Sequence, residues 1–384
     1  MIKIIKNVEV FSPQLLGKKD ILIANDKIAA VEDSITLNDS HVQLIDGSGK
    51  IAIPGIIDSH VHIIGGGGEG GFKTRTPELA FSDLVRGGIT TVIGCLGTDG
   101  VTRNLNSLYA KAKALDEEGV TCYIYSGSYR VPIVTFTGSL LQDLILIDKV
   151  IGAGEIAICD HRSSQPTLEE LKRIAADARV GGILSGKAGV VNLHLGDGEM
   201  MLDMIYEIVN KTEIPITQFL PTHINRNERL LNEGLNYAKM GGFVDFTTST
   251  DSLLKEDLQA WKALKLYIEN GFEDQITFSS DGQGSLPRFN ERKEFIGLDV
   301  GKVTCDYEQF RLAVEHGVAI ERALKAITLN PAKVLKLHNK GTIARGKDAD
   351  ILLLDHDLTL VDVIARGKML MSNYEIIIKG TFES

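Results

Sequence analysis

The chain has 384 residues, of which 43% are hydrophobic and 24% are charged, and its formal net charge is −10. This length fits a barrel of about 250 residues with a smaller attached unit. An acidic chain repels nucleic acid and anionic lipid, so neither nucleic acid nor a membrane is expected as a partner. The N-terminus lacks the apolar core of a signal peptide, and no apolar run has the length of a membrane span. Four scattered cysteines without CxxC spacing are typical of reduced thiols rather than disulfides or metal ligands. We therefore expect a cytoplasmic protein.

The chain begins with predicted strands. Residues 1–53 contain apolar stretches separated by turn residues, in the segments IKIIKNVEVF, KDILIANDKIAAVED and VQLIDGSGKIAIP. Short strands broken by turns are typical of a small β unit.

The middle of the chain alternates apolar strands with helical stretches. Helices are predicted around residues 105–119, 167–179, 201–212 and 258–271. Strands that are apolar on both faces and alternate with helices predict an α/β fold, a (β/α)₈ TIM-like barrel. An open doubly wound sheet is the alternative, but no glycine-rich dinucleotide loop leads from the first strand into a helix. The eight predicted strands are 55–63, 88–97, 120–127, 155–160, 190–196, 214–223, 243–250 and 275–282.

The C-terminal end repeats the strand pattern of the N-terminal end, in GTIARGKDADILLLD, TLVDVIARGKMLM and YEIIIKGTF. Two β-rich ends around a different middle predict one small β-sandwich domain formed by both termini. The predicted domains are therefore 1–54 plus 342–384 for the sandwich, and 55–341 for the barrel.

Polar residues gather at the predicted strand ends, where barrel enzymes place their chemistry. His60 and His62 are two residues apart at the end of the first strand, so both imidazoles face the barrel mouth. A single HxH pair is weak evidence for a metal, but four more candidate ligands raise it. Imidazole and carboxylate without thiolate suit Zn²⁺, Mn²⁺, Fe²⁺ or Co²⁺. The further candidates on strands 4, 5, 6 and 8 are Glu155, His194, His223 and Asp281.

Six ligands exceed what one catalytic zinc needs, so two metals bridged by a carboxylate fit better. His60, His62 and Asp281 would hold one ion, and His194 and His223 the other. A metal-bridging hydroxide is the expected nucleophile, with Asp281 as the general base and acid that moves its proton to the leaving amine. Asp160 could orient a ligand imidazole. The segments 65–71 and 284–303 follow ligand-bearing strands and are candidates for a closing loop.

Several segments resemble a known family. PGIIDSHVHI, SSDG, TLNPAKVLKL and GTIARGKDADILLLD are similar to the amidohydrolase superfamily. Narrower segments resemble the isoaspartyl (β-aspartyl) dipeptidases, above all the glycine-rich stretch that leads from HxH to Glu69. These segments are GGGGEGGFKTRTPE (65–78), GTDG (97–100), SGSYRVP (126–132), CDHRSSQPT (159–167), HLGDG (194–198), LPTHINRN (220–227) and SSDGQGS (279–285).

The resemblance implies a binuclear metal-dependent dipeptidase of the omega-peptidase type, which hydrolyses the isopeptide bond of β-aspartyl dipeptides. It implies two divalent ions per subunit, with Zn²⁺ favoured, and a homo-oligomer with an even number of subunits, such as an octamer. Tyr129 would polarise the scissile carbonyl, and Glu69 would bind the free α-amino group. The other implied substrate-binding residues are Arg162 and Arg226, which would hold carboxylates, and Thr98 and Ser285, which would add hydrogen bonds.

One position departs from the family pattern. Many members carry a lysine on strand 4 that is carboxylated by CO₂ and bridges the metals. Glu155 stands where that lysine would fall, seven residues before Arg162. Related amidohydrolases use glutamate there, so Glu155 is expected as the bridge, although its side chain is three chain atoms shorter. The alternative is a site with one well-held metal that Glu155 only tunes.

Two other functions stay open from the sequence. Another amidohydrolase could open cyclic amides, as hydantoinases and dihydropyrimidinases do, or deaminate a base, because such enzymes share HxH and the strand-8 aspartate. They have less reason for the glycine-rich loop and the two arginines. A non-catalytic scaffold would be expected to have lost metal ligands, whereas all the expected ligands are present in this chain.

Overall fold

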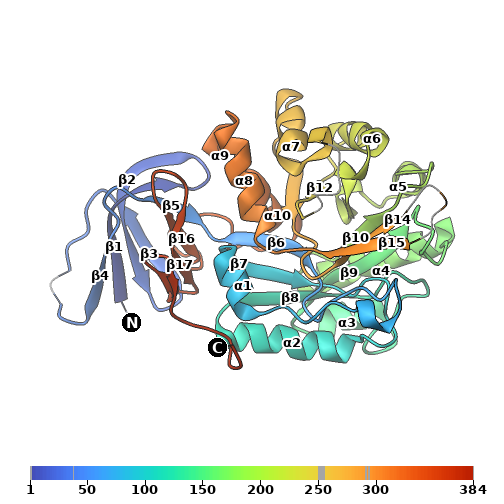
Figure 1. The fold of residues 1–384 in the computed structure, drawn as a ribbon, viewed down its shortest axis with the longest axis horizontal. Helices are drawn as coiled ribbons and strands as arrows, with labels where there is room; N and C mark the ends of the chain where they lie inside the picture. Colours follow the sequence, from blue (N-terminus) through green and yellow to red (C-terminus); the bar gives the residue numbers. More distant parts are fainter. Residues whose placement is uncertain (1, 38, 250–255, 290–291, 293–294, 384) are drawn as a thin grey trace.

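The structure is a computed structural model that describes all residues except 1, 38, 250–255, 290–291, 293–294 and 384. Figure 1 shows two parts: strands from both ends of the chain at the left, and parallel strands surrounded by helices at the right. Within the described ranges, no helix combines the length and the apolar character needed to cross a membrane.

The larger part is built on parallel strands. Six of them form one sheet in the order β11-β10-β9-β8-β7-β6, and β12 pairs with β13. A parallel bridge from Val61, at the end of β6, to Gly282 brings the last strand back beside the first. The strands therefore curl around in chain order, which fits the predicted barrel. Their bounds are β6 (Ile56–Val61), β7 (Ile89–Gly94), β8 (Thr121–Ser126), β9 (Val150–Ile158), β10 (Val190–Leu195), β11 (Phe219–Thr222), β12 (Val244–Thr247) and β13 (Ile276–Ser279).

Helices cover the outside of these strands, and the core lies between the two layers. Phe246 of β12, for example, packs edge-on against Tyr267 of α7 with ring centroids 4.9 Å apart, and both rings are fully buried. The helices are α1 (Phe81–Arg86), α2 (Leu105–Glu118), α3 (Leu140–Leu146), α4 (Leu168–Ser185), α5 (Asp203–Lys211), α6 (Glu228–Lys239), α7 (Ala260–Glu269), α8 (Cys305–Glu315), α9 (Ile320–Ile327) and α10 (Leu329–Val334).

Helix α4 illustrates how local sequence sets these elements. Thr167 and Glu170 form a capping box at its start, and Gly186 ends it in the left-handed region. The helix runs past the predicted limit of residue 179, through Gly181 and Gly182. A Cβ at Gly181 would lie 2.8 Å from Leu144 Cβ, so glycine is what lets α4 pack this closely against α3.

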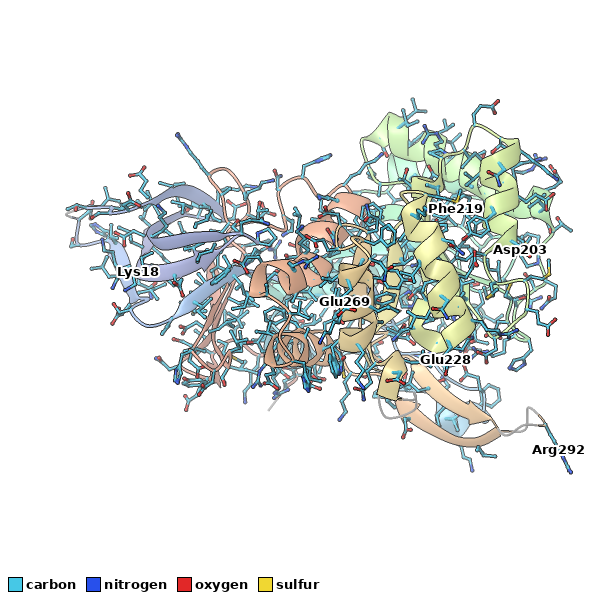
Figure 2. All side chains as sticks on the ribbon, turned by 90° about the horizontal axis from the view of Figure 1, so that it is seen from above. Lys18, Asp203, Phe219, Glu228, Glu269 and Arg292 are labelled. Atoms are coloured by element: carbon cyan, nitrogen blue, oxygen red, sulfur yellow. The ribbon has the colours of Figure 1, made fainter. Side chains whose placement is uncertain are left out.

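Two strands and one loop differ from the prediction. β9 begins at Val150 rather than at residue 155, because the glycine-rich segment before Glu155 pairs with β8 and β10. β11 begins at Phe219 rather than at residue 214, because a 3₁₀ turn occupies Ile216–Gln218. The stretch 284–303, expected as a loop, contains an antiparallel hairpin of β14 (Ser285–Phe289) and β15 (Phe295–Val300). Figure 2 shows this hairpin extending from the body of the molecule, with Arg292 at its far end.

Strands from both termini share one sheet in the smaller part. β5 pairs with β16 and so joins the two ends of the chain. The predicted sandwich is seen only in part, because hydrogen bonds connect the strands into one nine-stranded sheet. The strands form one sheet because β1 pairs with β2 on one edge, and with β4 and then β5 on the other edge. The strands are β1 (Ile2–Phe11), β2 (Leu15–Ala24), β3 (Lys27–Glu32), β4 (Val42–Asp46), β5 (Ile51–Pro54), β16 (Ile351–Leu354), β17 (Leu360–Ala365), β18 (Lys368–Ser372) and β19 (Glu375–Ile376).

Candidate metal centre and substrate pocket

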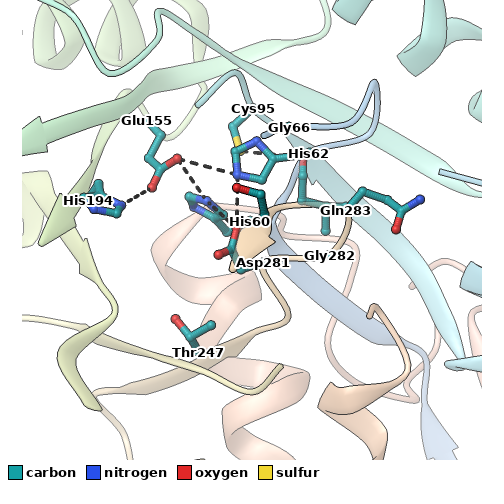
Figure 3. Close-up of polar contacts among 12 residues, drawn as sticks. His60, His62, Gly66, Cys95, Glu155, His194, Thr247, Asp281, Gly282 and Gln283 are labelled. Carbon is teal, nitrogen blue, oxygen red and sulfur yellow. Dashed lines mark hydrogen bonds and ion pairs between the residues drawn. The ribbon is translucent and has the colours of Figure 1, made fainter. Parts of the chain in front are cut away.

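Polar side chains from five strands of the curled sheet converge at one point (Figure 3). His60 lies in β6, with His62 directly after it. Glu155 lies inside β9 rather than at its start, and His194 lies in β10. The structure thus brings together all six side chains that the sequence predicts as metal ligands, and each is buried. The two that complete the group, His223 and Asp281, follow β11 and β13.

The Glu155 carboxylate lies between two groups of imidazoles. Its Oε2 atom is 3.3 Å from His60 Nε2 and 3.8 Å from His62 Nε2. Its Oε1 atom is 2.8 Å from His194 Nδ1 and 3.3 Å from His223 Nε2. Burial alone raises the pKa of Glu155, but the facing histidines hold that pKa well below its usual range. Each oxygen of an ionised carboxylate therefore faces a separate ligand pair.

Asp281 joins the first of these pairs. Its Oδ1 atom is 3.0 Å from His62 Nε2 and 3.7 Å from His60 Nε2. Its backbone N–H donates to the carbonyl oxygen of His60 at 3.1 Å, which fixes the two segments together. Asp281 (φ 52°) and His223 (φ 65°) both adopt the left-handed backbone region. Non-glycine residues rarely do so, and such residues cluster at functional sites.

Three buried atoms at this centre lack a hydrogen-bond partner among the described residues: His60 Nε2, Glu155 Oε2 and Asp281 Oδ1. Buried polar atoms are nearly always paired, so three unpaired atoms that face one another need an explanation. A divalent cation would satisfy all three, and nitrogen and carboxylate oxygen are donors that such ions accept. The residues present therefore fit a metal.

In three of the four histidine rings, the nitrogen that faces away from Glu155 lies within 3.0 Å of a side-chain oxygen. Partners of this kind orient a ligand imidazole and raise its basicity. The distances are 3.0 Å from His60 Nδ1 to Asn192 Oδ1, 2.9 Å from His194 Nε2 to Asp160 Oδ2, and 2.5 Å from His223 Nδ1 to Thr247 Oγ1. The structure thus places Asp160 where the sequence suggested an orienting role.

A cavity of about 720 Å³ opens beside the centre. Four of the predicted substrate-binding residues line it: Tyr129, Arg162, Arg226 and Ser285. The other two adjoin this set, because Glu69 accepts hydrogen bonds from Ser285 at 2.6 Å and from Thr98 at 3.3 Å. Apolar side chains, including Met200, Met204 and Leu286, line the cavity as well.

The two arginines differ in how they are paired. Arg162 donates to both oxygens of Asp160, at 2.7 Å and 3.0 Å, and lies 3.5 Å from Glu69. Arg226 has a buried Nε atom without a hydrogen-bond partner among the described residues. Leaving a buried donor unsatisfied costs free energy, so Arg226 is the better placed of the two to accept a carboxylate.

Tyr129 lines the cavity together with His194 and His223. Its hydroxyl is 2.8 Å from His194 Nδ1. Burial, and then the charge of Glu155, raises the pKa of Tyr129 well above its usual value. The phenol thus keeps its proton and can donate a hydrogen bond.

Sequence reasoning missed Cys95, Asn192 and Thr247. Cys95 was set aside because the cysteines lack CxxC spacing, yet it follows β7 at the same rim as the histidines. Its Sγ atom belongs to a group with His60, His62 and Glu155 whose donor atoms all lie within 4.8 Å of one another. Strand position could have found it, and Asn192 also stands two residues before His194 on one strand face.

Comparisons with known proteins agree with this geometry. Residues 214–372 match the family model described as the amidohydrolase family. The β-aspartyl dipeptidase of Fervidobacterium islandicum AW-1, solved in complex with a β-Asp-Leu dipeptide, is 52% identical, with 98% of each chain covered and a TM-score of 0.93. A dihydroorotase of Elusimicrobium minutum (strain Pei191) is 27% identical over 92% of this chain and 88% of its own. Adenine deaminase 2 of Shouchella clausii (strain KSM-K16) is 24% identical, and the match spans 56% of its length.

Replacing Asp160 with asparagine should weaken metal binding. The change removes the charge that His194 Nε2 and Arg162 face, and loss of such a partner lowers metal affinity by about 10–100-fold. Zinc titration of metal-free protein against a competing chelator measures the effect. Asp357→Asn, at an exposed carboxylate, is the control and should leave affinity unchanged. Equal affinities for wild type and Asp160→Asn would contradict the orienting role.

Proposed function

Because the chain belongs to the β-aspartyl dipeptidases of the amidohydrolase superfamily, we propose that it hydrolyses the isopeptide bond of β-aspartyl dipeptides. The observation that carries the proposal is the presence of both a positive and a negative side chain at the cavity beside the candidate metal centre. Arg226, with its unsatisfied Nε, lines the cavity, and the Glu69 carboxylate adjoins it. A dipeptide has carboxylates and an ammonium group, so a site with both charges recognises its two ends.

Glu69 is the proposed partner of the substrate's α-amino group. Ser285 donates to one of its oxygens and Thr98 to the other, so two hydroxyls orient the carboxylate. Arg162 and Arg226 are the proposed partners of the substrate carboxylates. Guanidinium groups suit this role because they stay charged and bind carboxylates in two-point contacts.

In the proposed metal centre, Glu155 would be a ligand of both of two divalent ions. His60, His62 and Asp281 would complete the ligands of one ion, and His194 and His223 those of the other. Zinc suits this set of nitrogen and oxygen donors. Divalent ions bound there supply Lewis acidity that polarises the scissile carbonyl and acidifies water.

The chain's own residues carry the remaining chemistry. Tyr129 donates its phenolic proton in a hydrogen bond to the scissile carbonyl oxygen, where negative charge develops. Asp281 accepts a proton from the attacking water and returns it to the leaving amine. The leaving residue would contact apolar side chains that line the cavity, such as Met204 and Leu286.

Tyr129→Phe should lower kcat for β-Asp-Leu by about 10²–10³-fold with little change in KM, because the lost donor acts on charge that exists only in the transition state. Steady-state kinetics with metal analysis of the same samples tests this. Tyr374→Phe, at a mostly exposed tyrosine, is the control. Unchanged kcat in Tyr129→Phe at full metal content would remove the residue from the mechanism.

Glu155→Ala should lose at least one metal ion per chain, because both ligand pairs face that carboxylate. Wild-type activity should not depend on bicarbonate, since no carboxylated lysine is needed. Elemental analysis and turnover with and without bicarbonate are the measurements, with Glu207→Gln at a partly exposed glutamate as the control. Two metals per chain with unchanged turnover in Glu155→Ala would show that Glu155 is not the bridge.

A substrate panel separates the proposal from its rivals. We expect cleavage of β-Asp-Leu and none of hydantoin, dihydroorotate or adenine, because none of these rings carries an ammonium group for Glu69. We also expect no cleavage of α-Asp-Leu, because its scissile carbonyl lies one carbon nearer to the α-amino group. Chromatography of the products at equal enzyme and metal concentrations measures this. Turnover of a ring substrate without turnover of β-Asp-Leu would favour a cyclic amidohydrolase or a deaminase instead.

A further inference from the structure

Cys95 is a buried thiol inside the metal centre that the proposed mechanism does not use. It follows β7, and its side chain is fully buried. Its backbone N–H donates to the carbonyl oxygen of Val61 at 3.0 Å, which holds it beside the HxH segment. Figure 3 shows the side chain next to the ring of His62, and the distance from Sγ to His62 Nδ1 is 3.8 Å.

The sulfur is one of four potential donors that face one another. Sγ of Cys95 and one donor atom each of His60, His62 and Glu155 lie within 4.8 Å of one another. Two atoms of this group's residues, His60 Nε2 and Glu155 Oε2, are buried and lack a hydrogen-bond partner among the described residues. Two ligands of one tetrahedral zinc lie about 3.6 Å apart, given bonds of about 2.3 Å to sulfur and 2.1 Å to nitrogen. Donor atoms that are 4.8 Å apart would therefore have to approach by about 1.2 Å, a movement shared between two side chains, to bind the same ion.

The charge of the centre favours a thiolate. Two divalent ions carry more positive charge than the Glu155 and Asp281 carboxylates neutralise. The next carboxylate, Asp160, is already paired with Arg162. Uncompensated charge is costly in a buried site. A thiol that coordinates a metal loses its proton, which passes to solvent, so Cys95 would supply the additional negative charge.

We propose that Cys95 is a thiolate ligand of the ion that His60 and His62 hold. The inference rests on the metal centre of the proposed function and adds a soft donor to it. Soft donors favour ions such as Zn²⁺ over Mn²⁺ or Mg²⁺, so Cys95 would also bias the choice of metal. The competing role is a contact to His62 Nδ1 that only orients the ring.

X-ray absorption of the zinc-loaded full-length protein tests the bond directly. We expect a sulfur scatterer at about 2.3 Å from zinc in the wild type, beside nitrogen and oxygen scatterers. Cys95→Ser should lose it. Cys122→Ser should keep it, because Cys122 is an equally buried cysteine on β8 whose sulfur contacts the carbonyl oxygen of Tyr123.

Cobalt substitution gives a second readout that does not depend on activity. Co²⁺ added to metal-free protein should give a near-ultraviolet thiolate-to-cobalt band in the wild type and Cys122→Ser. Cys95→Ser should lose this band and keep the visible cobalt bands. Zinc affinity of Cys95→Ser should fall at least about tenfold, as for loss of any group that supports the metal.

The outcomes separate this inference from the proposed function. Zinc bound to wild type with only nitrogen and oxygen scatterers would overturn the Cys95 ligand and leave the metal centre standing. Wild type that binds no zinc or cobalt would overturn the proposed metal centre itself, and the ligand with it. If Cys95→Ser does not fold, the wild-type and Cys122→Ser spectra still decide the question.

Discussion

The contact of the buried Glu155 carboxylate with two separate groups of imidazoles is the interaction on which the rest of the site depends. A buried carboxylate is costly unless its charge is compensated, and each Glu155 oxygen faces an imidazole nitrogen, at 2.8 Å from Oε1 and at 3.3 Å from Oε2. The strands must come close for this to happen. A Cβ at Gly154 would lie 2.9 Å from Asn192 Cβ, so the glycine before Glu155 lets β9 approach β10. Asn192 in turn contacts His60, so strand packing and ligand orientation share one contact.

A chain of charged groups connects this centre to the substrate pocket. Asp160 contacts His194 on one side and Arg162 on the other. Arg162 lies 3.5 Å from Glu69, which Ser285 and Thr98 hold in place. A change at Asp160 would therefore act on a proposed metal ligand, His194, and on the charged groups proposed to bind the substrate. Interactions within such a network are not additive, so its members are best separated by double-mutant cycles.

Much of the candidate site could be predicted from the sequence, because its residues lie at the ends of predicted strands. The spacing of His60 and His62, and the histidines that close β10 and β11, predicted the ligand set because carboxyl ends of parallel strands meet at one rim. The start of β9 could not be predicted, because its glycines are poor strand formers, and Glu155 was therefore expected at the start of the strand although it lies inside it. The pairing of β1 with three strands was not predictable, because a strand pattern carries no information on which neighbours it meets. Cys95 was not predicted as a metal ligand because the cysteines lack CxxC spacing, but that spacing is typical of sites built mainly from cysteine. The domain limits, the oligomeric state and the metal identity stay predictions.

Proteins named dihydroorotase and adenine deaminase also match most of this chain, so the proposed selectivity for a dipeptide would have to come from the residues that line the cavity. Which ligand the cavity favours depends on the polar side chains that stay without a hydrogen-bond partner when the ligand has no charge. A ring without a carboxylate, such as adenine, leaves the buried Arg226 Nε without a partner, and an unsatisfied buried donor costs about 1–3 kcal/mol, or more when charged. At about 1.4 kcal/mol per factor of ten, that one atom disfavours such a ring by roughly 5–150-fold. The Glu69 carboxylate would add to this discrimination, because a ring without an ammonium group leaves that second buried charge without a substrate partner.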